Sequence, residues 1–232
     1  MKKILLFLLI LFTTTSCVFA KNSINVDYQN GIYHIILSGD KIKKKIQFVS
    51  SSKLITNKEA HNNSESILTI NAGFFDPKNQ KAISYIVSDY QIAEDPFFNE
   101  NFMLNPLMRK NMKSILNRTE FRILDCDNKL KYEIVPRNAK IDFLCSVKTS
   151  AQAGPQLLPN LRLEEEFFLV KDSEGNVIRE SASVLHKTPR TLIGIKSLPK
   201  GEHSRCLLVF KIFAVCQFYE VCTHFGCFAT DG

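Results

Sequence analysis

The sequence predicts an α+β fold that is rich in strands, built mainly from antiparallel or mixed sheet with a few flanking helices. Short β-branched and aromatic runs alternate with turn-forming residues, two pairs of such runs are spaced as hairpins, and stretches with helical spacing are few. We find no internal repeat, low-complexity linker or break in composition. Residues 21–232 are therefore expected to form a single domain.

The expected strands are runs of apolar residues bounded by Gly, Asn, Asp or Ser. In chain order they cover residues 32–37, 46–50, 67–75, 83–87, 192–195 and 206–212. Residues 121–124 and 132–135 are expected to pair across a turn, and residues 167–170 and 177–178 across another. Neighbouring strands of this kind pair antiparallel.

Helices are expected at two places. Residues 107–116 follow Asn105-Pro106 and carry apolar side chains at 108, 112, 115 and 116, while residues 218–225 carry them at 218, 221, 222 and 225. Both patterns are close to the spacing of one helix face.

The first twenty residues have the layout of a secretory signal. Lys2 and Lys3 precede an apolar run over residues 4–12, and Val18 and Ala20 occupy the positions where signal peptidase requires small residues. The run is too short to span a bilayer, which needs about 20 residues. We expect an exported protein of the periplasm, cell envelope or exterior that begins at Lys21. A lipoprotein acylated at Cys17 is the less favoured alternative.

Charge and hydropathy limit the possible partners. Removal of residues 1–20 takes away two lysines and no acidic residue, so the formal net charge falls from +7 to +5. Lysines 41, 43, 44 and 45 form the one dense basic run, which is more typical of a solvated strand edge than of a nucleic-acid site. No later stretch is long and apolar enough to cross a membrane. We therefore expect neither a nucleic-acid partner nor a stable membrane span.

Six cysteines follow the signal, at positions 126, 145, 206, 216, 222 and 227. In an oxidising compartment an even number suggests disulfides, and six cysteines allow 15 pairings. Cys126 and Cys145 stand apart from the rest and flank a predicted hairpin strand, so we expect them to be bonded to each other. No cysteine or histidine spacing of the zinc type is present, so no metal site is expected, and no motif requires a cofactor.

Three segments bring polar residues and glycines to the ends of apolar strands. They are residues 71–76 (NAGFFD), residues 152–158 (QAGPQLL) and residues 188–191 (TPRT). Glycine permits a close backbone approach, and amides, carboxylates and guanidinium groups can bind a polar ligand. Taken one at a time, each segment is more often an ordinary turn.

In their order along the chain these segments resemble the phosphodiester glycosidase family, whose best-known member removes N-acetylglucosamine from a phosphodiester on mannose. The resemblance lies in residues 71–75, in Ala-Gly-Pro at 153–155 followed by two leucines, in Arg190-Thr191 before a glycine-containing strand, and in Asp231-Gly232. It extends from about residue 31 to the last residue. The first two segments are fairly specific to the family, and the last two are not specific alone.

The resemblance implies a hydrolase acting on sugar-1-phosphodiesters in envelope or exported glycans. A sugar leaving through C1 develops oxocarbenium character and needs a carboxylate nearby, whereas a departing phosphate needs a cation. The implied catalytic residues are Asp231 as the carboxylate, Asp76 as the reserve carboxylate and Arg190 as the phosphate ligand. The implied substrate-binding residues are Asn71, Gly73, Gln152 and Gly154. Strand-end capping by Asn71 and Gln152, and a surface ion pair at Arg190, remain open alternatives.

The chain departs from the family pattern near its C-terminus. Family members continue the closing Asp-Gly with glycines and serines, and they insert a turn with its own Asp-Gly before the last helix. We therefore expect a C-terminally incomplete domain with little or no glycosidase activity as written. The alternative function is a non-catalytic envelope protein that keeps the fold and binds glycans.

Overall fold

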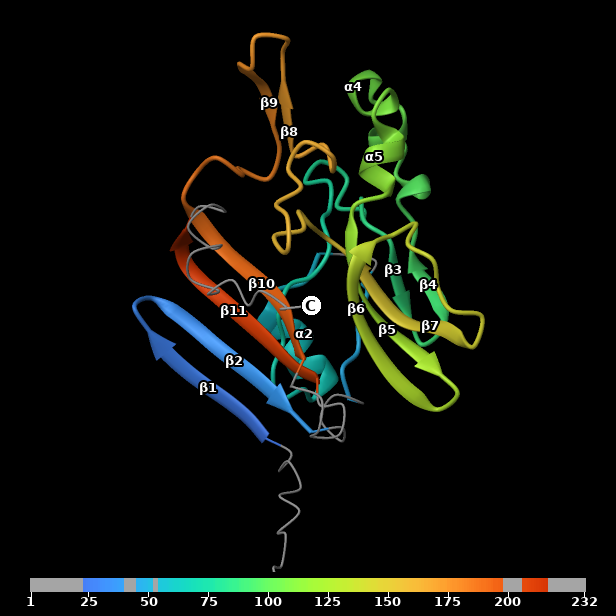
Figure 1. Cartoon of the computed structure of the whole chain (residues 1–232), viewed down its shortest axis with the longest axis vertical. Helices are drawn as coiled ribbons and strands as arrows, with labels where there is room; N and C mark the ends of the chain where they lie inside the picture. Colours follow the sequence, from blue (N-terminus) through green and yellow to red (C-terminus); the bar gives the residue numbers. More distant parts are fainter. Residues whose placement is uncertain (1–22, 40–44, 52–53, 198–205, 217–232) are drawn as a thin grey trace, which may run out of the picture.

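A computed structural model describes residues 23–39, 45–51, 54–197 and 206–216 of the chain (Figure 1). Two antiparallel sheets and a separate hairpin contain most of the regular secondary structure of the described part, and the helices are short. The predicted α+β class, rich in antiparallel strands with few helices, is thus confirmed.

A four-stranded antiparallel sheet, on the left in Figure 1, has the order β1-β2-β11-β10. Its strands are β1 (Ser23–Gln29), β2 (Ile32–Ser38), β10 (Thr188–Ser197) and β11 (Cys206–Cys216). The predicted strands at 32–37, 192–195 and 206–212 all lie in this sheet, whereas β1 was not predicted. β1 and β2 join through Asn30 and Gly31, whose φ angles of 54° and 77° are those that a tight hairpin turn requires.

A five-stranded antiparallel sheet, on the right in Figure 1, has the order β4-β3-β7-β5-β6. Its strands are β3 (Ile86–Ser88), β4 (Gln91–Glu94), β5 (Thr119–Cys126), β6 (Lys129–Pro136) and β7 (Cys145–Gln152). β5 and β6 are the first predicted hairpin, and their turn residues Asp127 and Asn128 both have positive φ. The second predicted hairpin is β8 (Leu169–Lys171) with β9 (Val177–Glu180), which pair apart from the two larger sheets.

Two predicted strands are wrong. Residues 46–50 and 67–75 form no strand, although Phe75 makes an isolated bridge with Ala82. Their alternating apolar residues nevertheless pack into the core, among them Ile46, Phe48, Leu68 and Ile70. The alternation of apolar and polar residues thus correctly indicated which side chains are buried. A strand, however, also needs a neighbouring backbone with which to pair. Of the predicted strand 83–87, only the end from Ile86 onward belongs to β3.

The predicted helix at 107–116 is interrupted. It consists of α4 (Pro106–Arg109) and α5 (Met112–Leu116), separated by two residues. Three helical elements were not predicted: α2 (Asn57–Ser64), α3 (Glu100–Met103) and the 3-10 turn η1 (Pro96–Phe98). They are polar or very short, so hydrophobic periodicity does not reveal them. The predicted helix at 218–225 lies outside the described residues.

The main core lies between the two large sheets. Ile35 and Leu37 of β2 pack against Phe121 and Ile123 of β5, and all four side chains are buried. A second cluster includes Ile32, Leu192, Phe168 and Val184 and joins the four-stranded sheet to the segment before β8. No helix in the described part of the chain has the length and apolar character needed to cross a membrane.

The predicted disulfide is present. Cys126 at the end of β5 and Cys145 at the start of β7 face each other in the register, with an S–S distance of 2.00 Å. Antiparallel pairing therefore brings the two cysteines together, as their spacing around the hairpin strand predicted.

Candidate functional site

A cavity of about 280 Å³ lies where the segment before β3 meets the start of β10. Its lining consists of Asn57, Thr69, Ile70, Asn71, Pro189, Arg190 and Thr191. Thr191 Oγ1 donates a hydrogen bond of 2.9 Å to Asn71 Oδ1, and 120 positions of the sequence separate the two residues. We call this site the Asn71–Thr191 cavity. It contains parts of two of the three segments that the sequence singled out.

Local structure holds both walls of the cavity in place. Asn57 begins α2, whose N-terminus is closed by a capping box: Thr56 accepts a hydrogen bond from Glu59 N, and the Glu59 carboxylate accepts from Thr56 N. The opposite wall is the start of β10, where a register shift between Thr188 and Arg190 interrupts the regular ladder with β11. Such irregularities at the end of a strand redirect side chains.

Arg190 lies at the edge of the cavity with its guanidinium held by backbone carbonyls. Nη2 donates to Ser183 O at 2.7 Å and to His186 O at 2.9 Å, and Nη1 donates to Ala182 O at 3.4 Å. These contacts fix the orientation of the guanidinium, and the three carbonyls belong to residues that do not line the cavity.

The loop that holds Arg190 is itself anchored by Glu180. One carboxylate oxygen of Glu180 accepts a hydrogen bond of 3.2 Å from Leu185 N, and the other lies 2.9 Å from His186 Nε2. Val184, directly before Leu185, is completely buried. The orientation of Arg190 thus depends on a chain of contacts through Glu180.

Asp76, the reserve carboxylate, is part of a turn. Its Oδ1 accepts a hydrogen bond of 2.8 Å from Lys78 N, and its backbone exchanges hydrogen bonds with Gln80 and Lys81. It does not line the Asn71–Thr191 cavity. Turn stabilisation is the role that the structure gives it. Asp231, the preferred carboxylate, lies outside the described residues.

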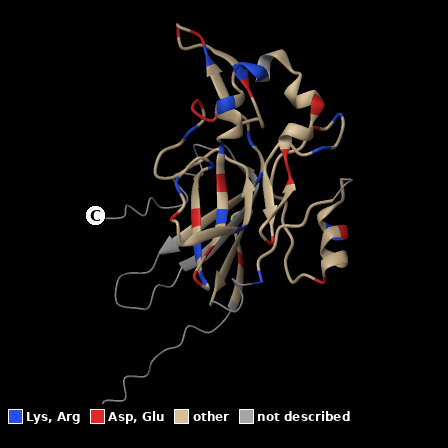
Figure 2. Ribbon diagram, turned by 90° about the vertical axis from the view of Figure 1, so that its right-hand side faces the viewer, with Lys and Arg blue, Asp and Glu red and all other residues tan. Residues whose placement is uncertain are grey.

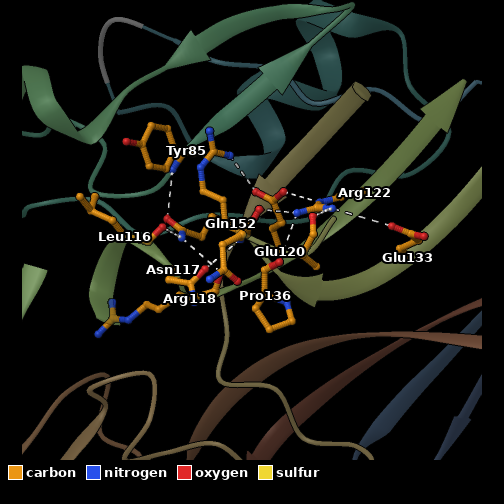
Figure 3. A network of polar contacts seen from close by, with 12 residues as sticks. Tyr85, Leu116, Asn117, Arg118, Glu120, Arg122, Glu133, Pro136 and Gln152 are labelled. Carbon is orange, nitrogen blue, oxygen red and sulfur yellow. Dashed lines mark hydrogen bonds and ion pairs between the residues drawn. The ribbon is translucent and has the colours of Figure 1, made fainter. Parts of the chain in front are cut away.

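Gln152 is buried at the end of β7, with 1% of its surface exposed. Figure 3 shows its amide between Tyr85, Leu116 and Arg118: Nε2 donates to Leu116 O at 2.9 Å and to Arg118 O at 3.2 Å, and Oε1 accepts from Tyr85 N at 3.4 Å. Leu116 is the last residue of α5. The structure therefore gives Gln152 the capping role and does not bring its side chain to the cavity.

The two glycines of the segments permit close approaches of the chain to itself. A Cβ on Gly73 would lie 2.9 Å from Ser84 Cβ and 3.2 Å from Gln152 O. Gly154 has a φ of +94°, and a Cβ there would collide with Oε2 of Glu166. Each glycine is therefore required by packing inside the protein.

These close approaches bring the three segments together. A Cβ on Gly73 would lie only 3.2 Å from Gln152 O, so the two backbones are close together. The ring centroid of Phe74 lies 5.6 Å from that of Phe168, which a Cβ on Gly154 would also approach closely. Asn71, at the start of the same segment, reaches Thr191. Residues 71–74 thus contact both of the other segments, one through the core and one at the cavity.

The sequence did not reveal a buried charged cluster of Arg118 and Glu166, which contacts the segment at residues 152–156 through Gln156 N. The carboxylate of Glu166, 1% exposed, accepts hydrogen bonds from Thr119 Oγ1 at 2.6 Å, Thr119 N at 3.2 Å and Gln156 N at 3.2 Å. Arg118 stacks on Phe168 at 3.9 Å, and burial lowers its pKa to about 10 despite the nearby Glu166. The sequence feature that could have revealed this cluster is Glu166, the last of three consecutive glutamates and directly followed by two phenylalanines.

A second buried ionic cluster lies on β5 and β6. Glu120 accepts from Arg122 Nε at 2.6 Å and from Arg137 Nη1 at 2.9 Å, and Arg122 also donates to the carbonyls of Pro136 and Ala139 (Figure 3). Arg137 stacks on Tyr85 at 3.6 Å. Because the charges are paired and hydrogen-bonded within the sheet, their role is structural.

Elsewhere, acidic and basic residues are interspersed along the described ribbon (Figure 2). Among the described residues, no group of three or more His, Cys, Asp and Glu side chains could hold a metal ion. Cys222 and Cys227 lie outside the described residues, and for Cys206 and Cys216 only the backbone is described.

Comparison of the chain with protein-family models, curated proteins and solved structures gives no match. A functional proposal therefore has to rest on the residues and the geometry of this chain.

Proposed function

We propose that the chain is an exported, glycosidase-like protein of the sugar-1-phosphodiester hydrolase type. It binds its substrate at the Asn71–Thr191 cavity and uses Asp231 as the carboxylate for a turnover that we expect to be slow in the chain as written. One observation carries the proposal. Asn71 and Arg190-Thr191, which come from two of the family-like segments, line the same cavity and are joined by a hydrogen bond.

The chemistry of the described lining suits a sugar phosphate. Asn71 is exposed, and because its Oδ1 accepts from Thr191, the amide is oriented with its N–H groups available to a sugar hydroxyl. Arg190 supplies a positive charge in a fixed orientation, and guanidinium groups are well suited to phosphate oxygens. Binding thus uses neutral hydrogen-bonding groups for the sugar and one cation for the phosphate.

Hydrolysis requires a carboxylate near the anomeric carbon. The described lining contains none, and Asp76 is engaged in its own turn. The proposal accordingly assigns that role to Asp231, on the strength of the family resemblance.

The absence of a carboxylate from the described lining also supports a second candidate, a non-catalytic glycan-binding envelope protein. Amide, hydroxyl and guanidinium groups alone are sufficient to recognise a sugar phosphate. The two candidates share the ligand and differ only in turnover.

Calorimetric titration with N-acetylglucosamine 1-phosphate and hydrolysis of a chromogenic sugar-1-phosphodiester separate these possibilities. We expect Arg190→Lys, which loses the two-pronged geometry of a charge-assisted contact, to weaken binding by about ten-fold or more, and Asn71→Ala, which removes a neutral hydrogen bond, by about two- to ten-fold. Thr191→Val, which keeps the shape of the side chain but loses the hydrogen bond to Asn71, should have a smaller effect. Thermal melting of each variant checks that the fold is intact.

Each outcome selects one reading. Turnover that Asp231→Asn abolishes supports the enzyme, whereas binding without turnover supports the glycan-binding protein. Wild-type protein that binds no sugar phosphate contradicts the enzyme, and it contradicts the second candidate as well if neutral glycans also fail to bind.

Export is a separate part of the proposal. We expect N-terminal sequencing of the mature protein to begin at Lys21, because Val18 and Ala20 fit signal peptidase. A product that begins with an acylated Cys17 would instead show a lipoprotein on a membrane surface.

A further inference from the structure

Two exposed tyrosines stack on each other at the end of the β1–β2 hairpin. Tyr28 and Tyr33 are directly opposite in the register, and their ring centroids lie 4.6 Å apart at an interplanar angle of 39°. Tyr28 is 60% exposed and Tyr33 is 47% exposed. They form an aromatic surface open to solvent.

The register places these tyrosines on the same sheet face as Thr191. Tyr28 is opposite Tyr33, Tyr33 is opposite position 212 of β11, and position 212 is opposite Thr191. Directly opposite residues of antiparallel strands point to the same side of the sheet. We call these four positions the Tyr28–Thr191 row. With strands about 4.8 Å apart, Tyr33 lies roughly 10 Å along the row from Thr191 and Tyr28 roughly 14 Å.

The burial of this face changes along the strands. Leu37 and Ile35, four and two residues beyond Tyr33 on the same side of β2, are 6% and 3% exposed and belong to the core between the sheets. At Tyr33 the face is open, and the Asn71–Thr191 cavity begins at Thr191 in the same row. The tyrosines therefore lie on the same sheet face as Thr191, two and three strand positions away from the cavity wall that Thr191 forms.

A cross-strand aromatic pair also stabilises a hairpin, by roughly 0.2–1 kcal/mol. That contribution does not depend on which row the pair occupies. It accounts for the stacking of the two rings but not for their alignment with Thr191.

We propose that Tyr28 and Tyr33 form a second sugar subsite, which binds a further sugar unit of the glycan whose phosphorylated sugar occupies the cavity. Sugar rings have an apolar C–H face and a rim of hydroxyls, and tyrosine offers an aromatic face and a hydroxyl. The inference rests on the proposed function and extends it: the ligand is an oligosaccharide or polysaccharide phosphodiester rather than a single sugar phosphate.

The test compares three probes by calorimetry: N-acetylglucosamine 1-phosphate, N,N′-diacetylchitobiose 1-phosphate and neutral chitotetraose. We expect the disaccharide phosphate to bind more tightly than the monosaccharide phosphate. Tyr33→Ala and Tyr28→Ala should weaken the disaccharide phosphate about two- to ten-fold, the effect of one aromatic contact, and leave the monosaccharide phosphate unchanged. Tyr33→Phe, which keeps the aromatic face, should retain most of the affinity.

Tyr90→Ala is the matched control, because Tyr90 is 46% exposed and lies in the turn between β3 and β4 of the other sheet. It should change the affinity for none of the probes. Circular dichroism and thermal melting exclude unfolding of the hairpin as the cause of any loss.

The outcomes separate the subsite from the proposed function. If the monosaccharide phosphate binds and the tyrosine variants bind the disaccharide phosphate as well as wild type, the subsite is wrong and the proposed function stands. If only chitotetraose binds, and does so through the tyrosines, the subsite stands and the phosphodiester function is wrong. Absence of binding to all three probes overturns both.

Discussion

Gly154 faces the carboxylate of Glu166 so closely that a Cβ at this position would collide with Oε2, and its φ of +94° is one that other residues rarely adopt. The same carboxylate holds Thr119 and Gln156 by hydrogen bonds. The Ala-Gly-Pro segment therefore depends on a buried acid that does not line the cavity proposed for the ligand.

We predict that Gly154→Ala lowers the free energy of unfolding by roughly 2–5 kcal/mol, since the substitution combines backbone strain with overpacking. Denaturant unfolding measures the change. Gly175→Ala is the matched control, because Gly175 has a φ of +89° but no atom within 4 Å of a built Cβ. Gly175→Ala should lower the free energy of unfolding by the backbone strain alone, roughly 1–2 kcal/mol. Equal losses at the two sites would contradict the collision with Glu166.

Gln152→Leu should destabilise the fold by about 1–3 kcal/mol or more, because it leaves the buried carbonyls of Leu116 and Arg118 without their amide donor. Affinity for sugar phosphate, measured on the folded fraction, should stay within two-fold of wild type. A stable variant with much weaker binding would return Gln152 to the ligand site.

Glu120→Ala should cost about 3–5 kcal/mol, since it removes the close counter-charge of the buried Arg122 guanidinium and leaves only Glu133, at 3.9 Å. Lys131→Ala provides the contrast: Lys131 pairs with Glu133 at 2.7 Å, but its side chain is 57% exposed. Exposed pairs contribute about 0–1 kcal/mol. Urea midpoints of the two variants should therefore differ clearly, and similar midpoints would argue against a structural role for the Glu120 cluster.

Removal of the Cys126–Cys145 disulfide by double substitution with serine should lower stability by about 3 kcal/mol, the value expected for closing a loop of this length in the chain-entropy model. Peptide mapping under non-reducing conditions should recover the two cysteines in one linked fragment. Free thiols at both positions, or a link from either to another cysteine, would disprove the pairing.

Helix α2, which supplies Asn57 to the cavity, should loosen in acid. Hydrogen bonds from the backbone and then the side chain of Thr56 lower the pKa of Glu59 below its ordinary value of 4.5. A lowered folded pKa means that the stabilisation is fully present above the ordinary value and is lost as the pH falls through the lowered value. Amide-exchange protection factors in α2 should therefore be smaller at about pH 3 than at pH 7.

Glu59→Gln is the control for this dependence, because glutamine can also complete a capping box but does not titrate. Its protection factors should change less between the two pH values. The same decrease in both proteins would assign the acid effect to another group.

The hairpins and the disulfide could be predicted because their determinants are local. Asp127 and Asn128 form the turn of β5 and β6, and the pairing that brings Cys126 to Cys145 connects neighbouring segments. The segments at 46–50 and 67–75 were predicted as strands because their apolar residues alternate with polar ones. This alternation reflects burial: both segments pack against the core but have no strand partner.

The candidate site was likewise predictable from the sequence only in part. The sequence by itself identified the three unusual segments, the α+β class and the cysteine pair, because these follow from residue type and near-neighbour order. Only the tertiary structure decided that Asn71 meets Thr191 at a cavity, that the buried Gln152 binds the last carbonyl of α5, and that Tyr28 and Tyr33 share a row with Thr191. Each of these relationships joins residues far apart in the chain, so it depends on strand order and register, which the pattern of residue types along the chain does not specify.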